Sequence, residues 1–129
     1  MNNFEHTVHT SKSFDEAVQA VEQITAAKGF RVLHVHDVAA TLAEKGFQRE
    51  PLKIIEICNA KYAHEVLQKD VMTALMLPCP IVVYALSGKT HISTMLPSIM
   101  EGFFPGKGLG PVAAIVEKVA VAIVDEAAH

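Results

Sequence analysis

Cys58 and Cys79, the two cysteines of the chain, carry the side chains best suited to nucleophilic or redox chemistry. Such chemistry needs a thiolate, which the N-terminal end of a helix stabilises, and Cys58 stands directly before Asn59, a residue that favours the start of a helix. Cys79 lies between Pro78 and Pro80, too far along the chain to form a Cys-x-x-Cys redox motif with Cys58. The pattern fits a thiol-dependent enzyme that uses Cys58 with Cys79, and it also fits two cysteines that pack as small apolar side chains.

Histidine supplies a second group of reactive side chains, with seven in the chain. His34 and His36 are two residues apart in a segment typical of a strand, so both rings point to the same face and could share a metal ion. His6 could join them if its own strand lay beside theirs, and His64, His91 or a cysteine could complete the site. The alternative is a strand end that is exposed to solvent and holds no metal.

The glycine-rich segment GKGLG, residues 106–110, suggests phosphate binding but does not match the P-loop pattern. Glu101 stands at the first glycine position, and Gly108 follows Lys107 in place of serine or threonine. The segment does offer backbone N–H groups and the Lys107 ammonium group ahead of a predicted helix, which could hold an anion. We expect the wider segment 102–111 to be a surface loop, whose two phenylalanines could fold back onto the core or cover a pocket.

The composition is typical of one folded domain, residues 1–129, since half of the residues are hydrophobic and 19% are charged. Nucleic acid is not expected as a partner, because the net charge is −3 and the 11 basic residues are scattered among 14 acidic ones. Glu117 and Lys118 interrupt the most apolar segment, so no membrane span is expected. The N-terminus lacks the pattern of a signal peptide, which predicts a cytoplasmic protein with free thiols.

Hydrophobic periodicity predicts an α+β domain with the element order β-α-β-α-β-α-β-β-α. Ser13 with Glu16 forms a capping box before the first helix, and Ser87 with Gly88 forms a two-residue turn between two antiparallel strands. We expect a two-layer sandwich in which helices pack on one face of a mixed, mostly antiparallel sheet of about five strands. Strands are expected at 4–10, 30–36, 52–58, 81–86 and 90–96, and helices at 14–28, 38–45, 60–69 and 111–127.

The segment LMLPCPIVVY, residues 75–84, determines where the fourth strand can start. Leu77 and Cys79 each precede a proline and are thereby held in extended backbone, and Pro80 has no N–H group for a strand hydrogen bond. We therefore expect the strand to begin as the chain passes Cys79.

The final helix, residues 111–127, has a wide apolar surface. Its charged side chains, Glu117, Lys118, Asp125 and Glu126, fall within about half of its circumference. An apolar face of this width predicts that the helix covers the sheet and also meets a second copy of the chain, so we expect a homodimer.

Three segments, GFRVLHVHDVAATLAEKGF, KIIEICNAKYAHEVLQKD and LMLPCPIVVYAL, resemble the bacterial and archaeal family called domain of unknown function 302. The similarity covers roughly residues 4–97. It implies that Cys58, Asn59, Pro78 and Cys79 are characteristic motif residues of a compact α+β domain that is often a homodimer, and it implies no particular reaction.

The chain departs from the family pattern near its end. Leu96 stands before Pro97 where an acidic residue is expected, and the loop at 102–111 with its double phenylalanine is atypical. Any role of the segment after Pro97 is therefore not carried over from the family.

The sequence leads to one main hypothesis and two alternatives. The main hypothesis is a cytoplasmic homodimer that binds a small ligand or partner near Cys58, Asn59 and Cys79, with Pro78 and Lys107 as further candidate ligand-binding residues. The alternatives are a thiol-dependent enzyme and a protein that binds a soft metal through cysteine and histidine. No organic cofactor is expected.

Overall fold

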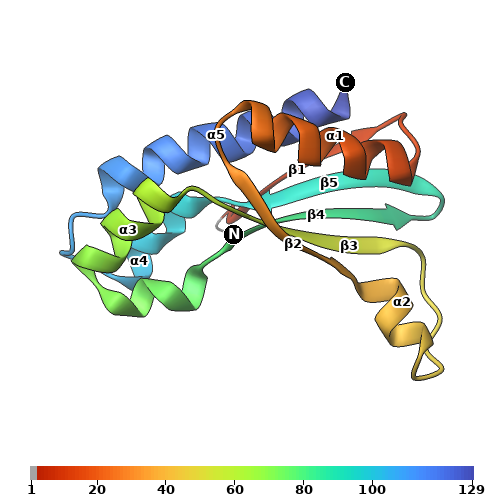
Figure 1. The fold of residues 1–129 in the computed structure, drawn as a ribbon, viewed down its shortest axis with the longest axis horizontal. Coiled ribbons are helices and arrows are strands. Elements are labelled where there is room, and N and C mark those ends of the chain that lie inside the picture. The colour runs from red at the N-terminus through yellow and green to blue at the C-terminus, as the bar shows by residue number, and fades with distance from the viewer. Residues whose placement is uncertain (1–2) are drawn as a thin grey trace.

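The computed structural model describes residues 3–129, and in this range five strands form one antiparallel sheet (Figure 1). Their order across the sheet is β1-β5-β4-β3-β2. Every neighbouring pair is antiparallel, so the sheet contains no parallel pair in the described range, where a mixed sheet was expected. The α+β class is confirmed. The strands are β1 (Glu5–Thr10), β2 (Arg31–Asp37), β3 (Leu52–Cys58), β4 (Cys79–Leu86) and β5 (Lys89–Met95).

The main helices lie on one face of this sheet, where α1 and α5 run side by side (Figure 1). The sequence did not reveal three short elements, two 3₁₀ turns and a four-residue helix, because elements of about one turn depend on packing more than on periodicity. The last of them overlaps the start of the predicted loop at 102–111. The helices are α1 (Phe14–Ala27), α2 (Val38–Ala43), α3 (Ala60–Lys69), α4 (Met100–Phe103) and α5 (Gly110–Ala128), with 3₁₀ turns η1 (Val71–Met76) and η2 (Pro97–Ile99).

Local signals in the sequence set the ends of several elements. At the start of α1, the Ser13 hydroxyl accepts from the Glu16 N–H and the Glu16 carboxylate accepts from the Ser13 N–H, which confirms the capping box. Ser87 and Gly88 both have positive φ, as the tight turn between β4 and β5 requires. The Glu50 carboxylate accepts hydrogen bonds from both of their N–H groups, each 2.9 Å long. The turn is therefore held from outside its own hairpin.

The core lies between the sheet and the two long helices. Alternate residues of the central strands point toward the helices, and Ile55, Ile81 and Ile92 have no exposed surface. The apolar surface of α5 is largely used inside the chain, where it packs on α1, α3, β1, β5 and η2. Its buried residues are Val112, Ala113, Val116, Ala120, Ile123, Val124 and Ala127.

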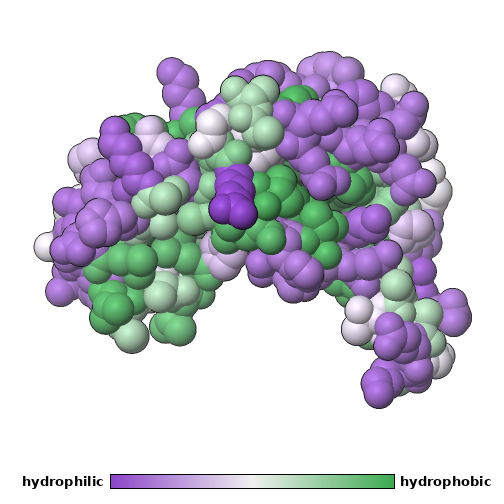
Figure 2. All heavy atoms as spheres, in the orientation of Figure 1, coloured by the Kyte–Doolittle hydropathy of each residue, from purple (hydrophilic) through white to green (hydrophobic). Residues whose placement is uncertain are grey.

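The face of the sheet turned away from α1 and α5 is hollowed (Figure 2). The 3₁₀ turn η1 projects beyond this face at one end and α2 projects at the other (Figure 1). We call the face of the sheet that is turned away from α1 and α5 the open face. Over residues 3–129, none of the helices combines the length and the apolar character that a membrane span requires.

Candidate functional site

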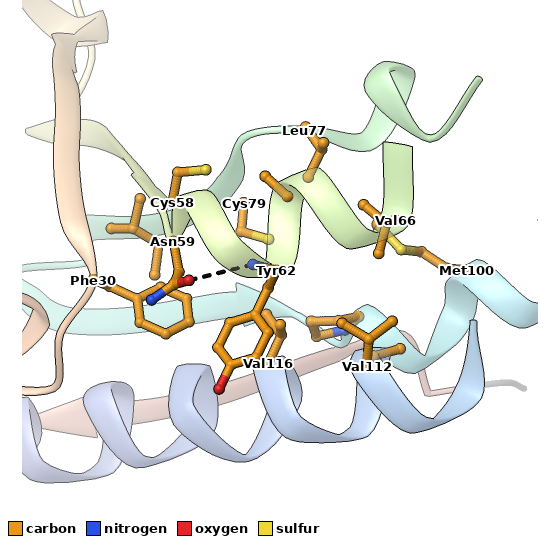
Figure 3. A pocket seen from close by; sticks show the side chains of 14 residues that line it. Phe30, Cys58, Asn59, Tyr62, Val66, Leu77, Cys79, Met100, Val112 and Val116 are labelled. Atoms are coloured by element: carbon orange, nitrogen blue, oxygen red, sulfur yellow. Dashed lines mark hydrogen bonds between the residues drawn. The ribbon is translucent and has the colours of Figure 1, made fainter. Parts of the chain in front are cut away.

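The two cysteines lie on neighbouring antiparallel strands, at the end of β3 and the start of β4. Ile57 is the direct partner of Cys79 in the sheet, so both side chains point toward the helices, while Cys58 follows Ile57 and points the other way. Figure 3 shows the two sulfurs on opposite sides of the strand pair. Both thiols are free, and side chains that diverge in this way cannot form a disulfide without movement of the backbone.

Burial disfavours the thiolate at both positions. Burial, with a smaller contribution from the negative charge of the neighbouring Cys58, raises the pKa of Cys79 from 9.0 to about 11. Burial also raises the pKa of Cys58, although a hydrogen bond from the Asn59 N–H opposes this in part. The start of α3 therefore does not provide the activation that the sequence suggested. At neutral pH both groups are thiols, which are weak nucleophiles.

Both polar atoms of the Asn59 amide group make structural hydrogen bonds. Its Oδ1 accepts from the N–H groups of Lys61 and Tyr62, at 3.0 and 3.3 Å, which confirms it as the N-cap of α3. Its Nδ2 donates to the carbonyl oxygen of Gly29, at 3.1 Å. Asn59 thus ties the start of α3 to the segment before β2, and its polar atoms already have partners.

A narrow apolar pocket lies beside this motif, between α3 and α5 (Figure 3). Its open volume is about 30 Å³, and the rings of Phe30 and Tyr62, 6.1 Å apart, stand along one wall. Cys58 and Cys79 both line it, from β3 and β4. The remaining lining residues are Ile57, Asn59, Ala63, Val66, Leu77, Pro97, Met100, Val112, Ala113 and Val116.

The lining contains no side chain that is charged at neutral pH, and the Asn59 amide is occupied by the helix cap. Such a surface holds a ligand through apolar contacts and offers nothing to balance a charge. Leu77 and Cys79 line the pocket on either side of Pro78, which is half-buried and lies outside the lining. The lining can therefore contact a small uncharged molecule.

Lys107 lies outside this pocket, in the loop before α5. Its Nζ is 3.8 Å from the Asp70 carboxylate, and the Glu101 carboxylate lies against Gly110 at the first residue of α5. An anion at the start of this helix would meet two carboxylates as well as one ammonium group. The structure therefore weakens the expectation of an anion site at Lys107.

The histidines are divided between the two faces of the sheet. His34 and His36 share the open face as predicted, with ring centroids 4.3 Å apart. The prediction that His6 could join them is wrong, because β1 and β2 are opposite edges of the sheet and His6 pairs with Asp125 of α5 at 2.7 Å. Across residues 3–129, no group of three or more His, Cys, Asp or Glu side chains is arranged to hold a metal ion.

The other two histidines considered for that site lie elsewhere. His64 is exposed on α3, and His91 stacks on Tyr84 in the middle of the sheet, with ring centroids 5.2 Å apart.

Sequence reasoning found the cysteines and Asn59 but missed most of the pocket wall. The spacing of Tyr62 and Val66 along α3, and of Val112 and Val116 along α5, places each pair on one helix face, which is a usable signal. That the two faces meet at the cysteines depends on how the helices pack.

Comparison with known proteins adds a family and a fold. The family model described as "Domain of unknown function DUF302" matches residues 6–127, which extends past residue 97, where the resemblance seen in the sequence ended. The crystal structure of an uncharacterized conserved DUF302 protein from Bacillus stearothermophilus is similar, with 32% sequence identity and a TM-score of 0.91. The alignment covers 98% of this chain and 99% of that one. No curated protein matches the chain.

Proposed function

Because the chain belongs to the DUF302 family, whose name assigns no activity, we propose its function from its own geometry: it binds a small, uncharged, apolar molecule in the pocket between α3 and α5. The observation that carries this proposal is the uncharged lining beside the Cys58–Asn59 motif. Burial keeps both thiols protonated, and Cys79, whose side chain points toward the helices, contributes polarizable surface to the pocket.

The size of the pocket sets a condition on binding. Its 30 Å³ is far below the roughly 300 Å³ or more of a typical ligand pocket. A ligand larger than a few atoms must therefore displace part of the wall. The wall formed by α3 and η1 is the lightly anchored part, because Val66 is the one buried residue of α3 and Thr73 the one buried residue of η1. Met100, which also lines the pocket, has a flexible side chain that adapts to a new shape.

Filling the pocket tests the proposal. Ala63 lines it, and Ala60 is exposed on the same helix, so Ala63→Leu and Ala60→Leu form a matched pair with equal change in helix propensity. With indole as a neutral apolar probe, we expect saturable shifts in the amide signals of Val66 and Val116 in the unmodified protein. These shifts should persist in Ala60→Leu and be lost in Ala63→Leu.

Two results would contradict this function. One is the absence of saturable shifts with both indole and the smaller probe benzene. The other is equal binding in both variants, which would place the probe at another surface. Circular dichroism and the unperturbed amide spectrum should first show that Ala63→Leu keeps its fold.

The homodimer expected from α5 needs a different surface, because most of the apolar face of that helix packs within the chain. We place the contact on the open face, over β1, β5, β4 and β3, where a hollow of about 500 Å³ is lined largely by uncharged side chains. Four strands about 4.8 Å apart and six to eight residues long present roughly 400 Å². This is about half of the ~800 Å² that each partner contributes to a standard interface. Beside it, η1 exposes Val71, Met72 and Leu75.

Two lysine substitutions separate the two interfaces. Val82 lies in the middle of the open face and Val121 is half-buried on α5. If the open face forms the dimer, Val82→Lys should halve the mass measured by light scattering and Val121→Lys should leave it unchanged. The reverse result would show that α5 forms the interface. If the unmodified protein were a monomer, the homodimer proposal would be wrong.

A further inference from the structure

A second site, separate from the pocket between α3 and α5, is suggested by the pair of histidines at the edge of the open face. We propose that His34 and His36 chelate one divalent transition-metal ion of the class that prefers imidazole, which includes copper, nickel and zinc. The proposal does not depend on the apolar ligand, because none of its residues lines that pocket.

The backbone brings the two imidazoles together. Two residues apart on β2, the side chains emerge on the same face, and their ring centroids are 4.3 Å apart with the ring planes at 71°. Rings this close can each direct a nitrogen to a shared ion with bonds of about 2.0–2.1 Å. β2 is an edge strand, so the site is open to solvent on one side.

A carboxylate on the neighbouring strand orients one of the rings. Glu56 of β3 is the direct partner of His34 in the sheet, and its Oε2 is 3.0 Å from Nε2 of His36. With the proton on Nε2 donated to this carboxylate, Nδ1 of His36 is left as the ligand atom. Metal-binding histidines commonly have such a carboxylate partner, which fixes the tautomer and raises the basicity of the ring.

The surroundings leave room for further ligands. No third protein side chain in residues 3–129 converges on the pair as a ligand, so water or a small molecule would fill the other coordination positions. These positions can face a hollow of about 390 Å³ between α2 and the sheet, which His36 and Glu56 line together with Val38, Thr41, Leu42 and Ile54. A metal ion held by few protein ligands beside a hollow has the open positions of a site that binds an exogenous ligand.

The test is calorimetric titration of protein without a histidine tag with CuCl₂, NiCl₂ and ZnCl₂ at neutral pH in a weakly coordinating buffer. We expect one ion per chain, with copper bound more tightly than nickel or zinc. Glu56→Gln should weaken binding by about 10–100-fold, the usual effect of losing an orienting partner. His34→Asn and His36→Asn should each weaken it at least as much, while His64→Asn, on exposed α3, should not change it.

The location of the ion is tested independently of its affinity. Substoichiometric Cu²⁺ broadens nearby amide signals, and we expect the broadening to centre on residues 34–36 and 54–56. Broadening centred on the cysteines would overturn the proposal, as would broadening centred on His9 and His91, which are direct partners in β1 and β5 with ring centroids 6.4 Å apart. So would undiminished affinity in His36→Asn, or no measurable binding of any of the three ions by the unmodified protein.

Discussion

The ionisation of Cys79 is a direct test of whether this protein is a thiol enzyme. Replacing Cys58 with serine leaves Cys79 as the one thiol of the chain, so its ionisation can be followed by the rate of its reaction with iodoacetamide. Burial is the larger cause that raises the pKa of Cys79 to about 11, and the charge of Cys58 is the smaller one. In the variant we therefore expect a pKa somewhat lower than this value but still above the ordinary 9.0.

The expected rate follows from the fraction of thiolate. A pKa of about 11 in place of 9.0 leaves roughly one hundredth as much thiolate at neutral pH. Since the thiolate is the reacting form and the variant lacks the Cys58 charge, its lower thiolate fraction should slow alkylation at pH 7.5 by up to about 100-fold relative to an unburied cysteine. Alkylation should be slower still where the pocket wall hinders access. The same variant unfolded in guanidinium chloride should titrate near 9.0 and supplies the control.

The same pKa difference predicts how stability depends on pH. The raised pKa of Cys79 means that its neutral form is favoured in the folded state, so the associated stability is complete below pH 9 and is lost as pH rises toward about 11. The free energy of unfolding should fall by at most about 3 kcal/mol over this pH range. Urea denaturation of the unmodified protein should show this decline, and Cys79→Ala should make the dependence flatter in this range. A folded Cys58→Ser protein whose alkylation is half-maximal below pH 9 would refute the reasoning and favour the thiol enzyme.

Three further predictions concern the framework that positions the motif. Ile57→Ala, at a side chain with no exposed surface, should lower the free energy of unfolding in urea by about 2–5 kcal/mol, and a loss below 1 kcal/mol would contradict its central place in the core. Asn59→Ala should cost about 1–2 kcal/mol in the same assay and Asn59→Asp less, since aspartate keeps the cap; equal losses would instead assign the effect to the hydrogen bond with Gly29. Hydrogen bonds from the N–H groups of Gly88 and Ser87 lower the pKa of Glu50. Hydrogen-exchange protection of the Gly88 amide should therefore fall as the pH drops through this lowered pKa, and Glu50→Gln should lack that dependence.

The ends of most elements could be predicted from the sequence because they depend on local interactions. The capping box at Ser13, the Asn59 cap and the Ser87–Gly88 turn each involve groups within a few residues of one another. Strand β4 begins at Cys79, two residues earlier than the predicted 81–86, and Leu77 and Cys79 are extended because proline restricts the backbone of the residue before it.

The candidate sites were only partly visible in the sequence. Alternation placed His34 and His36 on one face, but the position of β1 in the sheet decided that His6 could not join them. The Glu56 carboxylate reaches His36 through the register of β2 with β3, which no single segment specifies.

What the sequence determined by itself is therefore the set of elements and the chemistry they carry, including the two thiols and the helix that starts at Asn59. Tertiary structure alone decided that Cys58 and Cys79 lie on paired strands with their sulfurs on opposite sides, and that α3 and α5 close an uncharged pocket beside them. The physical reason is the distance along the chain over which each interaction acts. Caps, turns and alternation are set by neighbours along the chain, whereas burial, which raises the pKa of both thiols, depends on segments brought together from the whole chain.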